Sequence, residues 1–164
     1  MVVVALSVMI FTATTSVLVG LKDAPAAFAA SEGYVITSVD APTIFSSRVD
    51  MDMASALEGM DNITGVSPEV FAFSSWDGHS FVVRGVDFDR LASVGPEMVA
   101  DMAVEPAGGS LGYAVLGCRL ADKMDLEPPS TIPLAGSYSA AVEVVLVAGT
   151  FSSGSPLDDE MLVT

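Results

Sequence analysis

The uncharged start of this sequence is its strongest constraint. The first charged residue is Lys22, and residues 2–21 consist mainly of Val, Leu, Ile, Met and Phe, interrupted only by small or hydroxyl-bearing residues. A helix of about 20 apolar residues crosses a hydrocarbon core of about 30 Å. We therefore expect residues 1–22 to form a transmembrane helix. A cleaved signal peptide is the alternative, because residues 27–29 (Ala-Phe-Ala) offer a small-x-small cleavage pattern.

The remaining residues, 23–164, have the length of one domain. The chain carries 21 acidic residues against 6 Lys and Arg, a formal net charge of -15. Such a charge repels the phosphate backbone, so nucleic acid is excluded as a partner. The single cysteine permits no internal disulfide. Stability must then come from buried apolar side chains.

Two elements are predicted in the first half of the domain. Residues 34–39 (YVITSV) are rich in β-branched side chains and predict a strand that stops at Asp40. Residues 50–60 predict a helix, because acidic residues occupy its first turn and apolar residues recur at helical spacing. We expect this apolar stripe to belong to the core; it consists of Val49, Met53, Leu57 and Met60.

A β-hairpin is predicted over residues 66–87. Asp77-Gly78 suits a type I′ turn because both positions tolerate positive φ. This turn accounts structurally for His79, the only histidine, which we expect to face Trp76 across the strands. Asp87 is then expected to cap a short helix over residues 88–94.

The last third predicts a strand, a sharp turn and a helix. Residues 111–116 form an apolar strand, a helix begins at Gly117, and Pro128-Pro129 prevents its continuation. Further strands are expected over residues 131–134 and 140–149, and residues 161–164 begin either another strand or a return toward the membrane. The sequence defines residues 95–112 least. Helices mixed with a hairpin indicate the α+β class, with one mixed domain after the membrane helix.

The sequence lacks the common catalytic and metal-binding motifs. It contains no phosphate-binding loop, nucleophile elbow or zinc-binding helix. Its acidic groups lack the spacing of a calcium loop, so no metal or cofactor is expected; these groups are Asp50/Asp52, Asp87/Asp89 and Asp158/Asp159/Glu160. Residues 62–64 (Asn-Ile-Thr) form a glycosylation sequon beginning at Asn62, which matters only outside the cell.

Cys118 is the remaining candidate nucleophile. A helix start and Arg119 are features that lower the pKa of a thiol in general. No base lies near in sequence, because the only histidine already has a structural explanation in the hairpin. Cysteine is also a common small buried residue. We therefore predict no catalytic residue, and no enzymatic activity.

The order of the segments resembles the extracytoplasmic domain of FtsX-like ABC transporter permeases, the group with the MacB-type and LolC/LolE-type exporters. The resemblance is sharpest in AVLGCRLADKMDL, where the family has a strand, a glycine and a Leu-Ala helix, so that Gly117 matters and Cys118 occupies a variable position. It also includes ITGVSPEV, VVRGVD, TIPL, VEVVLVAGTF and LDDEMLV, in the family's order.

This resemblance implies a permease component in the cell membrane, with residues 23–164 on the extracytoplasmic side. Its partners are implied to be a separate ABC ATPase subunit, further permease helices or a second permease copy, and the lipid bilayer. Family permeases carry three more membrane helices after this domain, so we expect the chain to be the N-terminal part of a permease. Two alternatives are a membrane-anchored or secreted binding domain that stands alone, and a surface hydrolase using Cys118 or a serine.

Overall fold

The computed structural model describes Met9 and residues 11–12, 34–104, 112–135 and 141–164. The predicted transmembrane helix, residues 1–22, lies almost wholly outside this part, although Met9, Phe11 and Thr12 are helical. Within the described ranges, no helix has the length and apolar character needed to span a membrane.

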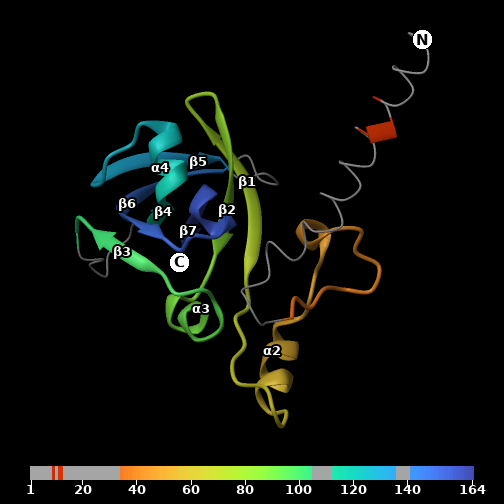
Figure 1. Ribbon diagram of the computed structural model, residues 1–164. Coiled ribbons are helices and arrows are strands. Elements are labelled where there is room, and N and C mark those ends of the chain that lie inside the picture. The colour runs from red at the N-terminus through yellow and green to blue at the C-terminus, as the bar shows by residue number, and fades with distance from the viewer. Residues whose placement is uncertain (1–8, 10, 13–33, 105–111, 136–140) are drawn as a thin grey trace.

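The described part of the domain is built on one mixed seven-stranded sheet (Figure 1). In spatial order the strands are β1 (Val70–Trp76), β2 (His79–Gly85), β7 (Glu160–Val163), β4 (Tyr113–Gly117), β6 (Val142–Ser152) and β3 (Val99–Met102), with β5 (Ser130–Ala135) beside β6. Neighbours β1–β2, β7–β4 and β6–β3 are antiparallel, whereas β2–β7 and β4–β6 are parallel, and β5 joins β6 antiparallel. A mixed sheet with helices packed on it agrees with the predicted α+β class.

The predicted hairpin is confirmed, with its strands inside the expected residues 66–87. Asp77 and Gly78 have φ of 46° and 79°, the left-handed backbone that a type I′ turn requires. Trp76 pairs with His79 across this turn. The single histidine is thus placed by the turn, as expected.

The strand-glycine-helix unit is also confirmed. β4 ends at Gly117, which caps α4 (Cys118–Met124), and the helix ends at Asp125 in the left-handed region, φ 49°. Gly117 itself has φ -59°, so positive φ is not the reason for a glycine there. A Cβ at this position would lie 2.5 Å from the Cα of Asp158 and nearer still to its carbonyl group. The glycine is needed because the two backbones touch.

Successive side chains of the central strands point to opposite faces of the sheet and form two hydrophobic clusters, one on each face. On β4, Ala114 and Leu116 join the cluster beneath α4, whereas Val115 joins the other cluster. On β7, Met161 and Leu162 divide in the same way. The second cluster lies on the face covered by α3 (Phe88–Val94), whose buried residue is Leu91.

Asp87 caps α3 as predicted, because its carboxylate accepts hydrogen bonds from the backbone of Asp89 and Arg90. The strand β3 was not expected from the sequence. α2 (Met51–Glu58) is confirmed with Asp50 as its cap, but its expected core stripe is not. Val49, Met53 and Met60 are exposed and Leu57 is half-buried, because within the described residues neither hydrophobic cluster extends to α2.

The predicted strand over residues 34–39 is wrong. These residues pair with no strand of the described sheet, and Tyr34 and Val39 are almost fully exposed. Ser38 instead accepts a turn hydrogen bond from Ala41 and donates its N–H to Ser47 Oγ at 2.8 Å. The segment therefore leads into a short 3-10 helix, η1 (Ile44–Ser46), because β-branched residues need a partner strand to form a ladder.

Candidate functional site

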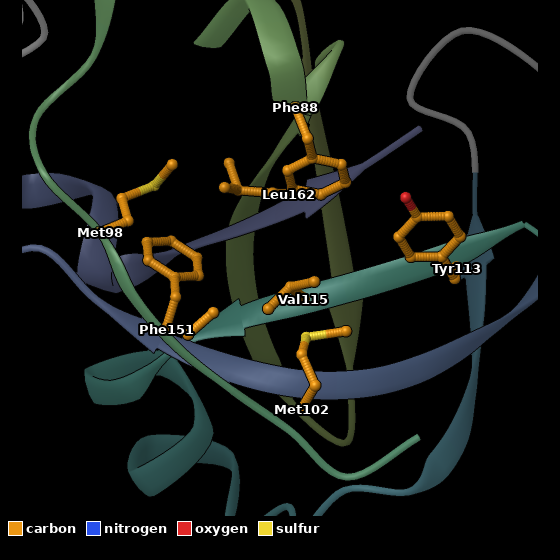
Figure 2. A pocket seen from close by; sticks show the side chains of 8 residues that line it. Phe88, Met98, Met102, Tyr113, Val115, Phe151 and Leu162 are labelled. Atoms are coloured by element: carbon orange, nitrogen blue, oxygen red, sulfur yellow. The ribbon is translucent and has the colours of Figure 1, made fainter. Parts of the chain in front are cut away.

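An apolar hollow lies on the α3 face of the sheet, and we take it as the candidate site. Its volume is about 170 Å³. Figure 2 shows aromatic, methionine and branched side chains around it, contributed by α3, by the β3 segment and by three central strands. Its lining consists of Phe88, Met98, Ala100, Met102, Tyr113, Val115, Phe151 and Leu162.

The floor of the hollow follows from strand register. Val115 on β4 pairs with Leu162 on β7, so both project on the same face. Phe151 on β6 pairs with Gly117 on one side and with Ala100 on the other. Because Val115, Phe151 and Leu162 are at least 95% buried, the floor is rigid core rather than mobile surface.

The β3 wall depends on Gly149. Met102 pairs with Gly149 of β6, and a Cβ on this glycine would lie 2.9 Å from the Cα of Met102. The absent side chain lets β3 approach β6 closely and brings Met98 and Met102 to the hollow. Methionine side chains are flexible and polarisable, so this wall can adjust to the shape of an occupant.

A second, more polar hollow of about 380 Å³ adjoins the first. Phe88 and Tyr113 line both, and their rings stack at 5.8 Å with an interplanar angle of 12°. Asp87 and Asp89 are among the residues that line it. We call the apolar space the inner hollow and the polar space the outer hollow. Together they offer apolar contact beside negative charge.

Arg84 on β2 is a buried cation on the same face of the sheet. Its Nε and Nη2 donate to the carboxylate of Glu160 at 2.7 and 2.9 Å, and its Nη1 donates to Glu69 at 2.5 Å. Its guanidinium also lies 4.4 Å from the ring centre of Phe71. Burial alone lowers the pKa of Arg84, but the hydrogen bonds and charges of Glu160 and Glu69 outweigh it and raise the pKa.

A second cluster of charged side chains forms ion pairs at the start of α4. Arg119 bonds Asp159 Oδ2 at 2.7 Å and Asp158 Oδ2 at 3.2 Å. Asp158 also accepts hydrogen bonds from Ser153 and from the N–H of Gly154. Burial alone raises the pKa of Asp158, but these hydrogen bonds and the charge of Arg119 hold it below its usual value.

The structure brings none of the sequence candidates together as a catalytic centre. Cys118 is half-buried at the start of α4, and no hydrogen bond joins it to His79 in the described structure. Asn62, at the sequon, is exposed with φ 73°.

Four side chains of the acidic groups have local structural roles. Asp50 and Asp87 cap helices, and Asp158 and Glu160 are buried against arginines. No cluster of three metal-binding side chains occurs among the residues described.

Sequence reasoning missed the inner hollow. Met98, Ala100 and Met102 fall in the stretch from which no element was predicted, and Val115 and Phe151 have the character of ordinary core residues. The one available signal was Asp87, whose cap fixes the start of α3 and therefore the position of Phe88.

Two of the solved structures that resemble this chain are as follows. One is the extracellular domain of the noncanonic ABC-type transporter YknZ from Gram-positive bacteria, at 15% identity and a TM-score of 0.41, over 69% of this chain and 60% of that chain. The other is a domain of a putative permease protein from Porphyromonas gingivalis, at 13% and 0.39, over 66% and 54%. The chain thus spans less than two thirds of the length of either of these chains. No protein-family model and no curated protein matches the sequence.

Proposed function

We propose that this chain is the membrane-anchored extracytoplasmic part of an FtsX-like ABC permease, and that it relays motion driven by a separate ATPase without catalysing a reaction itself. The observation that carries the proposal is the Arg84 group. It joins Glu69, in the segment that enters the sheet, to Glu160, on the last strand of the described chain. A displacement of either segment is thereby passed to the other.

Aromatic packing extends this connection toward the N-terminal segment. Phe45 of η1 packs on Phe71 and Phe73 of β1, with ring centres 5.5 and 4.9 Å apart. Phe71 in turn lies over the guanidinium of Arg84. A shift of η1 therefore reaches the sheet through contacts between side chains, as a rigid-body motion requires.

The hollows supply the other half of the proposal, a place to engage a substrate or partner outside the membrane. An apolar cavity with a few polar groups at its edge is the usual form of a binding site. This feature also favours the alternative of an anchored or secreted binding domain that stands alone. The two functions differ in whether the chain changes the rate at which an ATPase hydrolyses ATP.

The test is ATP turnover in an assembly of the full chain with permease helices and an ABC ATPase co-expressed with it. We expect turnover to change in Phe45→Ala, which removes the aromatic contact with β1. Met51→Ala, on an exposed position of α2, is the matched control and should leave turnover unchanged. Equal turnover with Phe45→Ala, or with the chain omitted, would contradict the coupling role.

The absence of catalysis is tested on the purified chain. We expect no hydrolysis of ATP, of small esters or of peptides. Ester or peptide turnover that disappears in Cys118→Ala would overturn this part of the proposal and favour a surface hydrolase.

A further inference from the structure

The inner hollow has the size of one side chain. Engineered protein cavities of about 150 Å³ bind benzene, and the inner hollow measures about 170 Å³. Its lining is apolar apart from the tyrosine hydroxyl, which Figure 2 shows at the Tyr113 end. One aromatic ring or branched aliphatic group fills such a space. A free molecule of that size has too few atoms to bind tightly, so a further contact must come from outside the hollow.

That further contact is available at Asp89. Asp87 Oδ1 already accepts hydrogen bonds from the N–H groups of Asp89 and Arg90, whereas the exposed carboxylate of Asp89 lines the outer hollow beside Phe88. The adjacent cation in the sequence, Arg90, is 3.8 Å from Asp87 and bonds Glu58 of α2 at 2.6 Å. The outer hollow therefore retains negative charge.

The whole chain adds to this preference. With a formal net charge of -15, it attracts polycations from a distance and repels anions. Apolar and acidic surfaces meet at Phe88 and Tyr113, which line both hollows. An occupant that matches both must carry an apolar group and a positive charge a few atoms apart.

We propose that the two hollows bind a basic peptide segment. The segment inserts one aromatic or branched aliphatic side chain into the inner hollow and places a neighbouring lysine or arginine against Asp89. This deepens the proposed function, on which it rests, by naming the chemistry of the partner. A peptide fits better than a small amine because the outer hollow is larger than the inner one and continues the contact along a chain.

The binding test uses the full chain in discs of zwitterionic phosphatidylcholine, so that a basic peptide gains nothing from lipid charge. The probe is the peptide acetyl-Gly-Lys-Phe-Lys-Gly amide, followed by NMR of the 13C-labelled methyl groups of Met98 and Met102. We expect both methyl signals to shift on titration. Replacing Phe by Ala in the probe should weaken binding about ten- to hundredfold, from the burial of one aromatic side chain.

Charge is tested with a matched pair of variants. Asp89→Asn should weaken binding about two- to fivefold at low salt, the range of an exposed ion pair. Asp101→Asn makes the same charge change on β3, but Asp101 lines neither hollow, so this control should bind like wild type. A probe with Glu in place of both Lys residues should not bind.

Access to the inner hollow is tested by filling it. Ala100 is exposed and lines the hollow, so Ala100→Phe should abolish the methyl shifts without removing core atoms; Val99→Phe, one residue earlier on β3, is the control. Equal binding of the Glu probe, or equal binding by Ala100→Phe and wild type, overturns the proposal. Methyl shifts that depend on protein concentration in the absence of peptide also overturn it, because a second copy of the chain then occupies the hollow. ATP turnover plays no part here, so failure of this inference and failure of the coupling role are separate results.

Discussion

Replacing Gly117 by alanine should destabilise the domain although the backbone there suits any residue. Its φ and ψ of -59° and 141° are ordinary, so alanine would stabilise the domain by about 0.4–1 kcal/mol because it reduces the conformational entropy of the unfolded chain. The opposing effect is steric. The new Cβ would lie 2.5 Å from the Cα of Asp158 and nearer to its carbonyl, and backbone atoms cannot turn aside as a flexible side chain does.

The contact cannot be relieved cheaply because Asp158 is held from several directions. Ser153, Gly154 and Arg119 all donate hydrogen bonds to its carboxylate. Overpacking costs about 1–3 kcal/mol, and loosening two of these hydrogen bonds adds about 0.5–1.5 kcal/mol each. After the entropic gain, we expect a net loss of about 2–4 kcal/mol, which lowers Tm by about 5–15 °C in a chain of this size.

The assay is thermal unfolding of the full chain, followed by the fluorescence of Trp76, the only tryptophan. Gly85→Ala is the matched control, because its Cβ would lie 3.5 Å from the nearest atom, an ordinary contact with Val70. Cys118→Ser should also cost less than Gly117→Ala. If the Tm of Gly117→Ala equals that of Gly85→Ala, or is higher than that of Cys118→Ser, the close approach to Asp158 is not what requires the glycine.

Three further predictions concern single positions. Gly78→Ala should destabilise the hairpin by about 1 kcal/mol because φ is 79° there, as measured by chemical denaturation. The pKa of Asp158 is lowered in the folded state, so its ionic contribution is fully present above the unfolded value of about 3.9 and disappears as pH falls through the folded value. The stability gap between wild type and Asp158→Asn should therefore shrink below about pH 4, and a gap that grows in acid would contradict this. Removing one partner of the buried pair, in Glu160→Gln or Arg84→Met, should cost about 3–5 kcal/mol, and the double variant should cost less than the sum of the two; additive losses in that cycle would argue against a direct interaction.

Elements whose signals lie within a few residues of one another were predictable from the sequence. Asp87 caps α3, Asp77 and Gly78 make the turn between β1 and β2, and Gly117 ends β4 and starts α4. The cap and the turn depend on hydrogen bonds and dihedral angles inside one turn of the chain. The requirement for a glycine at 117 was predicted correctly, but the touching backbone of Asp158 was not visible from the sequence.

Elements that depend on distant partners were not predictable. Residues 34–39 have β-branched side chains but pair with no strand of the described sheet, while β3 forms because Gly149 of β6 lets it approach. The inner hollow was hidden for the same reason. Val115, Phe151 and Leu162 have the character of core residues on their own strands, and only the register of β4, β6 and β7 makes them one surface.

The acidic run Asp158-Asp159-Glu160 shows why charge patterns alone could not locate the site. Consecutive acidic residues are usually exposed, yet Asp158 and Glu160 are nearly fully buried and Asp159 is exposed. Between them these three residues bind Arg84 and Arg119, two of only six lysines and arginines in the chain. Few cations therefore remain for the other carboxylates, and the negative charge is left uncompensated at positions such as Asp89. The same arginines that hold the sheet together thus leave the outer hollow acidic, which is the property on which its preference for a basic partner depends.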